Sequence, residues 1–409
     1  MRFFLAFLLC ASAFAQSFAL KSGDRVVFYG DSITDQRLYT TFTETFVVTR
    51  FPKLPVSFVH SGWGGDRVSG GGGGNIDVRL TRDVLAYRPT VMTIMLGMND
   101  GRYRAFDPEI FNTYAAGCRN IVDTVKKALP GIRITLIQPS PFDDVTREPQ
   151  FEGGYNAVLV RYGEFLKELA AAPGLSVADL NTGVVAALKK AKETNPELAP
   201  RIIPDRVHPG PGGHLLMAGE LLKAWGAPSI VSAVEIDAAA NRVVGAENTE
   251  VKELAGTNGL SWTQVDGALP MPMDAKDATL MLAVRSSDFV EKLNRQPLKV
   301  TGLTAARYTL RIDDESVGSF TREELADGVN LAVLSTPMAK QAAEVHALTL
   351  KHNNIHAARW RQLQVPLEKD APAHLRGAMD ALDTLEGDLV LAQRTTAQPR
   401  ARRYQLTAE

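Results

Sequence analysis

The stretch VVFYGDSITD, residues 26–35, decides how the rest of this sequence is interpreted. Its four apolar residues are enough for a short buried strand, and Gly30 ends that strand. An acid and then Ser32 follow, and the pattern predicts a helix capped by Thr34 or Asp35. A serine at such a turn lies at the carboxyl edge of a sheet, where open α/β folds keep their active sites. Ser32 is therefore a candidate nucleophile, and the alternative is a serine that only caps the helix.

The N-terminus and the charge of the chain limit its partners. The 409 residues have a net charge of −1, so no basic field is present that would bind nucleic acid. Residues 1–2 read Met-Arg, residues 3–9 are apolar and residues 13–15 read Ala-Phe-Ala, which is typical of a secretory signal peptide over residues 1–19. The apolar run is too short to span a membrane. We expect cleavage after residue 15 or 19, export to the periplasm or the extracellular space, and no stable membrane insertion. Nothing in the sequence predicts the oligomeric state.

A first domain is predicted over residues 20–228, where short apolar runs alternate with helical stretches. The expected strands cover residues 26–29, 56–59, 90–96, 132–137 and 175–178. The expected helices cover residues 36–51, 76–87, 108–129, 154–172, 182–192 and 213–225. This alternation predicts an α/β fold with a parallel sheet, and the fully apolar strands indicate that helices cover both faces.

A second module is predicted over residues 229–409. Short strands are expected at residues 230–236, 242–244, 261–265, 279–284, 298–301, 308–312 and 331–334, which favours a small, mostly antiparallel β structure. Two amphipathic helices are expected at residues 339–361 and 373–391. Because such helices need a surface on which to bury their apolar faces, we expect them to fold back over the first domain. The basic residues 400–403 are expected to form a solvated tail.

Polar motifs follow the other strands of the first domain. The second strand is followed by HSGWGGDR, residues 60–67, and then by five glycines at residues 70–74, which we expect to be a flexible loop. The third strand is followed by LGMNDG, residues 96–101. Later in the chain, Asp205 stands three residues before His208, close enough to orient its imidazole. None of these motifs has the spacing of a phosphate-binding loop.

Metal and redox chemistry have weak support in the sequence. His352 and His356 have the spacing of zinc ligands, but Asn353 stands where the zinc-protease motif requires a glutamate. Cys118 is the only cysteine outside the predicted signal peptide, so we expect a buried, inert thiol and no intrachain disulfide. We predict no metal and no cofactor.

The four polar motifs together resemble the SGNH hydrolases, also called the GDSL esterase/lipase family. The matching blocks are GDS at residues 30–32, GWGGD at residues 62–66, GMND at residues 97–100 and DRVHP at residues 205–209. The resemblance covers about residues 22–225, and His60 departs from it because many members carry Asn there. It implies a flavodoxin-like three-layer α/β/α domain. The β-rich and helical module that follows remains unassigned.

The resemblance implies ester hydrolysis through an acyl-enzyme, and the residues argue for the same chemistry. Ser32 is a poor nucleophile unless a base takes its proton, and His208 is the only histidine with an acid at a suitable spacing. Asp205 would orient that ring. The oxyanion is expected to bind the backbone N–H groups of Ser32 and Gly65 and the side-chain amide of Asn99.

The expected function is that of an exported serine esterase acting on a small-molecule or polysaccharide ester. Trp63 and Tyr103 stand beside the oxyanion motifs and favour acetylated sugars, because aromatic rings stack on sugars, although Trp63 could equally pack under the glycines. Two alternatives stay open: a lysophospholipase or thioesterase, and an inactive carbohydrate-binding protein. Asp31 and Asp100 are expected to hold turns, and His214 is expected to pack or cap.

Overall fold

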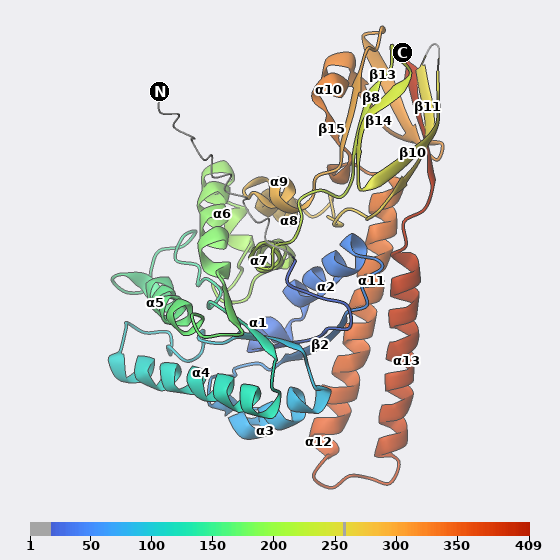
Figure 1. Ribbon diagram of the computed structural model, residues 1–409. Coiled ribbons are helices and arrows are strands. Elements are labelled where there is room, and N and C mark those ends of the chain that lie inside the picture. The colour runs from blue at the N-terminus through green and yellow to red at the C-terminus, as the bar shows by residue number, and fades with distance from the viewer. Residues whose placement is uncertain (1–17, 257–258) are drawn as a thin grey trace, which may run out of the picture.

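The computed structural model describes residues 18–256 and 259–409, and its first part is a three-layer α/β/α domain (Figure 1). The predicted signal peptide therefore lies largely outside the described residues. All five strands of the central sheet are parallel and run in the order β2-β1-β5-β6-β7. Their bounds are β1 (Arg25–Gly30), β2 (Ser57–Gly62), β5 (Val91–Met95), β6 (Arg133–Ile137) and β7 (Leu175–Ala178). The predicted parallel sheet is thus confirmed.

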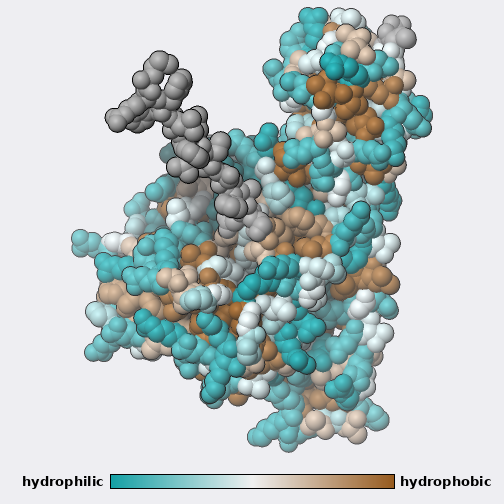
Figure 2. All heavy atoms as spheres, viewed as in Figure 1, coloured by the Kyte–Doolittle hydropathy of each residue, from teal (hydrophilic) through white to brown (hydrophobic). Residues whose placement is uncertain are grey.

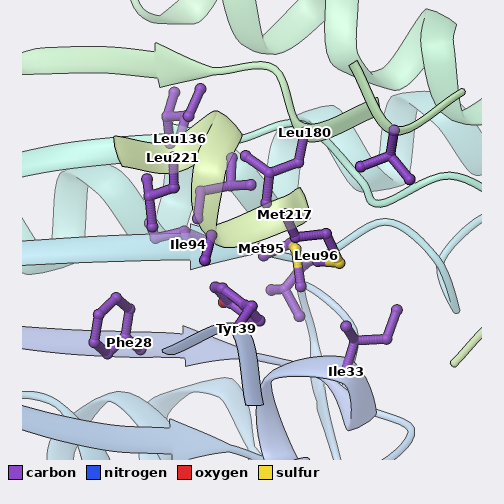
Figure 3. Close-up of a cluster of buried hydrophobic side chains, with 14 of the residues drawn as sticks. Phe28, Ile33, Tyr39, Ile94, Met95, Leu96, Leu136, Leu180, Met217 and Leu221 are labelled. Carbon is purple, nitrogen blue, oxygen red and sulfur yellow. The ribbon is translucent and has the colours of Figure 1, made fainter. Parts of the chain in front are cut away.

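Helices cover both faces of this sheet. Figure 1 shows α3, α4 and α5 on one face and α2 and α7 on the other. The bounds are α1 (Ser32–Asp35), α2 (Leu38–Arg50), α3 (Ile76–Asp83), α4 (Pro108–Ala128), α5 (Gly154–Leu169), α6 (Leu180–Thr194) and α7 (Pro211–Ala224), with 3₁₀ turns at Leu85–Tyr87 and Ala199–Arg201. Side chains from the strands and from α7, including Ile94, Leu136, Met217 and Leu221, meet in a buried cluster (Figure 3).

The turn after β1 has a different cap from the predicted one. Asp31 is the N-cap of α1, because its side chain accepts the Ile33 N–H at 3.0 Å, whereas α2, the helix expected at residues 36–51, follows Arg37, which makes no side-chain cap bond. Gly30 must lack a side chain here, since a Cβ would lie 2.7 Å from the Met95 carbonyl oxygen. The helix therefore begins at the serine itself.

The described residues of the second module form two sheets. One is antiparallel, in the order β10-β11-β16-β13-β14, and the other has the order β15-β12-β8-β9 with β12 and β8 parallel. The bounds are β8 (Ala233–Asp237), β9 (Arg242–Glu247), β10 (Thr249–Ala255), β11 (Gly259–Asp266), β12 (Pro297–Thr301), β13 (Arg307–Ile312), β14 (Glu315–Thr321), β15 (Val329–Asn330) and β16 (Arg402–Ala408). Figure 2 shows hydrophobic residues gathered on part of this module, and over the rest of that view hydrophobic and hydrophilic residues are interspersed.

Three predictions for this module are wrong. The strand expected at residues 279–284 is helix α8 (Ala278–Arg285), which starts because Asp277 caps it; a short apolar run does not by itself distinguish a strand from a helix. Residues 331–334 contain a 3₁₀ turn (Leu331–Val333). The basic residues expected in a solvated tail enter β16, the middle strand of the antiparallel sheet.

Two groups of helices from the second half of the chain pack against the first domain, and Val48 at the end of α2 is part of the core of the β module. Helices α8 and α9 (Phe289–Leu293) pack against α7 and contribute buried side chains to the core of the first domain. Helix α11 (Pro337–Ala357) lies against α2 and pairs with α13 (Leu375–Thr396), as predicted for the two late helices. We call the segment from α11 to α13 the helical hairpin. A π-helical segment (Ala358–Gln364) and α12 (Val365–Leu367) lie near its tip, and α10 (Arg322–Asp327) lies in the β module.

The contact between the helical hairpin and α2 contains a buried polar network. His352 Nε2 bonds to Glu44 Oε1 at 2.6 Å, and the other oxygen of Glu44 faces His60 Nε2 at 3.2 Å. Gln393 donates to Glu44 at 3.0 Å, and Glu386 lies 3.5 Å from His352 Nδ1. Burial opposes the charge on Glu44, but the neighbouring His352 holds its pKa well below the usual range. His60, which departs from the family pattern, is therefore part of the attachment between the two halves.

No helix among the described residues is apolar enough over a sufficient length to cross a membrane.

Candidate active site

Ser32, His208 and Asp205 form a continuous chain of hydrogen bonds. The Ser32 Oγ lies 2.8 Å from His208 Nε2, and His208 Nδ1 lies 2.7 Å from Asp205 Oδ2. With the Nδ1 proton donated to the carboxylate, Nε2 is free to accept the serine proton. The serine comes from the turn after β1 and the other two residues from the loop before α7, so the fold brings together groups that are 176 residues apart.

The loop of Asp205 is built to present both of its carboxylate oxygens. Oδ1 accepts the backbone N–H groups of Val207 at 3.0 Å and His208 at 2.7 Å, which leaves Oδ2 for the imidazole. Arg206 adopts a left-handed conformation (φ 75°) that turns the chain between them. Partial burial opposes ionisation of Asp205, but the hydrogen bonds from His208 outweigh it and hold the pKa of Asp205 below its ordinary value.

Two of the three predicted oxyanion donors, Gly65 and Asn99, lie on loops that touch each other, and the third, the Ser32 N–H, lies at the start of α1. Gly65 has a left-handed conformation (φ 78°), and among the described residues its N–H has no hydrogen-bond acceptor. The Asn99 amide donates one proton to the Asp66 carbonyl at 3.1 Å and accepts the Tyr103 hydroxyl at 3.0 Å. These two bonds fix which end of the amide carries the hydrogens, so its second N–H remains for a ligand.

A buried arginine beneath the second loop is missing from the sequence prediction. Arg79 of α3 is fully buried, and its guanidinium donates to Asp66 Oδ2 at 2.7 Å, to the Ser61 carbonyl at 2.8 Å and to Asp83. The guanidinium also lies 4.9 Å from the centre of the Tyr29 ring. Its i, i+4 spacing to Asp83 is visible in the sequence, but the loop that it supports is not.

The glycine run is ordered in the structure instead of forming the expected flexible loop. Residues 70–71 and 74–75 pair as the short strands β3 and β4. A Cβ at Gly73 would lie 2.5 Å from Trp63 Cδ2, so only glycine lets the backbone approach the ring this closely. Arg361 also lies against the ring, with its guanidinium carbon 3.6 Å from the ring centre. This favours the packing alternative for Trp63, whereas Tyr103 remains 39% exposed beside Asn99.

An open depression of about 520 Å³ lies over the serine. The residues that line it are all polar or charged: Ser32, Asp35, Gln36, Arg37, Asp205 and His208. Among the described residues no group of three or more His, Cys, Asp or Glu side chains is placed to hold a metal ion.

Three further predicted polar residues have structural contacts. Asp31 caps α1, and Asp100 accepts the Val68 N–H at 3.0 Å; burial raises the pKa of Asp31 to about 7 and that of Asp100 to about 6. His214 is buried, and its Nδ1 accepts the Tyr39 N–H at 3.2 Å. Burial lowers the pKa of His214 to about 3, so this ring is neutral and structural.

Comparison with known proteins agrees with this fold. Residues 28–216 match the model of the GDSL-like Lipase/Acylhydrolase family. An acetylxylan esterase from Geobacillus stearothermophilus is 25% identical over 228 residues, which cover 50% of this chain and 95% of the relative. The solved structure of a gut microbial diltiazem-metabolizing enzyme has a TM-score of 0.82 and 26% identity, covering 96% of this chain and 99% of that chain.

Residues 28–216 therefore form a GDSL-like, or SGNH, hydrolase domain, and the chain is a carboxylic ester hydrolase of that type. Because the match to the diltiazem-metabolizing enzyme extends over nearly the whole chain, the combination of the hydrolase domain with the β module and helical hairpin also occurs in that protein.

Proposed function

We propose that the protein is an exported serine esterase that removes short acyl groups, acetyl in particular, from carbohydrate esters. The hydrogen-bonded chain from Ser32 through His208 to Asp205 is the observation that carries this proposal. An acetylxylan esterase among the relatives supports the substrate class. The signal-peptide pattern of the first 19 residues supports export.

The reaction follows from the geometry in two halves. His208 Nε2 takes the Ser32 proton as Oγ attacks the ester carbonyl, and the oxyanion accepts hydrogen bonds from the N–H groups of Ser32 and Gly65 and from the Asn99 amide. The imidazolium then protonates the departing alcohol, which leaves Ser32 acylated. A water molecule, deprotonated by the same ring, cleaves the acyl-enzyme, releases the acid and restores the serine.

The polar lining of the depression favours a short acyl group over the long chain of the lysophospholipase alternative. Hydrocarbon chains bind in grooves lined mainly by apolar side chains, whereas Asp35, Gln36 and Arg37 surround the serine here. The intact hydrogen-bonded chain likewise argues against the inactive carbohydrate-binding alternative.

The test is a hydrolysis profile over p-nitrophenyl esters of increasing chain length, beside acetylated xylan and acetylated pectin. We expect the highest kcat/KM with acetate, release of acetate from at least one polysaccharide, and a loss on the order of 10⁴-fold or more for Ser32→Ala. Asp205→Asn should lower kcat/KM less than His208→Ala does, because it removes only the group that orients the imidazole. A Ser32→Ala variant that keeps more than a few per cent of activity would show that the nucleophile is misassigned.

A further inference from the structure

One side chain of the helical hairpin reaches the rim of the proposed active site. Arg361 Nη1 donates to Asp35 Oδ2 at 3.0 Å, across 326 residues of sequence. Its guanidinium carbon also lies 3.6 Å from the centre of the Trp63 ring. Asp35 lines the same depression as Ser32, so a residue from the second half of the chain touches the surroundings of the nucleophile.

Both contacts of Arg361 lead to the loop that carries the oxyanion donor. The carboxylate oxygen of Asp35 that receives Arg361 also accepts the Gly64 N–H at 3.2 Å. The second contact holds the ring of Trp63, whose carbonyl accepts the Asp66 N–H at 3.1 Å across the turn. Gly64 and Gly65 have no side chains with which to anchor themselves. One guanidinium therefore fixes the two residues that precede the Gly65 N–H.

The helical hairpin delivers this arginine through an unusual backbone. Arg361 lies in the π-helical segment, a form that is rare and frequently occurs at functional sites. The neighbouring Trp360 is 2% exposed, and its Nε1 donates to Asp83 Oδ1 at 2.6 Å. Its ring meets the ring of Trp63 edge-on, with the centres 5.7 Å apart. Trp360 thus anchors the segment under the loop while Arg361 extends to the rim.

We propose that Arg361 is a positioning residue for ester hydrolysis, which holds the Gly65 N–H where the oxyanion develops; this inference rests on the proposed function. The alternative is that Arg361 only attaches the helical hairpin to the first domain. That attachment has other contacts, however, including His352 with Glu44 and an Asn353 side-chain bond to Thr41 at 2.9 Å. Removing Arg361 should therefore affect the rate far more than the stability.

The test compares Arg361→Ala and Arg361→Lys with Arg359→Ala as a matched control. Arg359 lies in the same π-helical segment, but its guanidinium pairs with Asp383 of the helical hairpin at 2.8 Å. We expect Arg361→Ala to lower kcat on p-nitrophenyl acetate about 10- to 100-fold, part of the ~10²–10³-fold effect of losing an oxyanion donor, with KM within about twofold. Arg361→Lys should recover little of the lost kcat, since an ammonium cannot stack flat on the Trp63 ring while it donates to Asp35. Arg359→Ala should keep the wild-type kcat.

Two further measurements separate positioning from attachment. The affinity for phenylboronic acid, whose serine adduct places an oxygen in the oxyanion hole, should fall in proportion to kcat/KM. Arg361→Ala should lower kcat by a smaller factor in an Asp35→Asn background than in the wild-type background, because the two residues act on the same loop. Should the alanine variant fail to fold, Arg361→Lys supplies the same comparison.

The proposal is overturned if Arg361→Ala keeps kcat within threefold of wild type. It is also overturned if Arg359→Ala lowers kcat and the melting temperature as much as Arg361→Ala does, because attachment alone would then explain the loss. An active Ser32→Ala variant would instead refute the proposed function. A wild-type rate for Arg361→Ala together with an inactive Ser32→Ala variant would refute the positioning role alone.

Discussion

A chain cut after Ala227 tests whether the catalytic domain is stable without the rest of the protein. Such a fragment, residues 20–227, keeps Ser32, Asp205, His208 and the whole parallel sheet. It loses the side chains of the second half that are buried in the core of the hydrolase domain. The large ones are Met271, Leu280, Leu282, Phe289 and Leu293.

The loss of folding stability can be estimated from these five buried side chains. Burial of a large apolar side chain contributes about 1.5–3 kcal/mol, so the five together contribute on the order of 10 kcal/mol. About half of this burial free energy is assigned to the surface of the first domain that the five side chains cover. The fragment therefore loses on the order of 5 kcal/mol of folding stability. Glu44 also loses its partner His352. Since whole domains are stable by only about 5–15 kcal/mol, we expect the fragment to be unfolded or to aggregate.

The assay measures solubility, melting temperature and p-nitrophenyl acetate turnover of the fragment beside the full chain. Phe289→Ala in the full chain is the companion variant, because this 2% exposed ring packs on Gly219, and its loss should cost about 3–5 kcal/mol. Leu391→Ala is the control, since that side chain is 67% exposed and its loss should stay within about 0.5 kcal/mol. A soluble fragment with the full-length melting temperature and full turnover would refute the reasoning.

Two other predictions concern the buried network and the glycine run. Burial opposes the charge on His352, but the carboxylates of Glu44 and Glu386 raise its pKa to about 9, above the ~6.5 of an unfolded chain. The stabilisation by charged His352 is therefore complete below about pH 6.5 and fades as the pH rises through about 9. The difference in melting temperature between wild type and His352→Gln should be large at about pH 6 and small by about pH 9.5. A difference that stays constant over this range would contradict the prediction. Gly73→Ala should displace Trp63, cost about 1–3 kcal/mol and lower kcat, whereas Gly245→Ala, with a Cβ 3.8 Å from its neighbour, should do neither. Equal kinetics and equal melting for the two alanine variants would show that the ring is not held by the glycine.

The first domain was predictable because its pattern is local. Each strand of the parallel sheet is a short apolar run that ends in a break, and the helices between strands have their own caps, such as Asp107 before α4. The second module was harder, because its pairings are remote: β11 pairs with β16 across about 140 residues. A short apolar run such as residues 279–284 fits a strand or a helix, and the cap at Asp277 decided it.

The residues of the candidate site differ in the same way in whether the sequence could predict them. Ser32, Gly65, Asn99 and His208 stand in short motifs whose residue types already indicate their chemistry, so the sequence was enough to bring them together. Arg361 stands in no motif. Its role follows only from the position of the helical hairpin. The periodicity of the sequence does not specify which surface of the first domain two amphipathic helices will cover.

The place of β16 in its sheet has a consequence for synthesis of the chain. A ribosome makes residues 402–408 after every other strand of that sheet, yet they form its middle strand. Until they emerge, β10–β11 and β13–β14 can exist only as two separate hairpins, each with an unpaired edge. Open edges invite pairing with other chains. A premature stop a few codons before residue 402 would thus release a chain that has all of its proposed catalytic residues and still tends to aggregate.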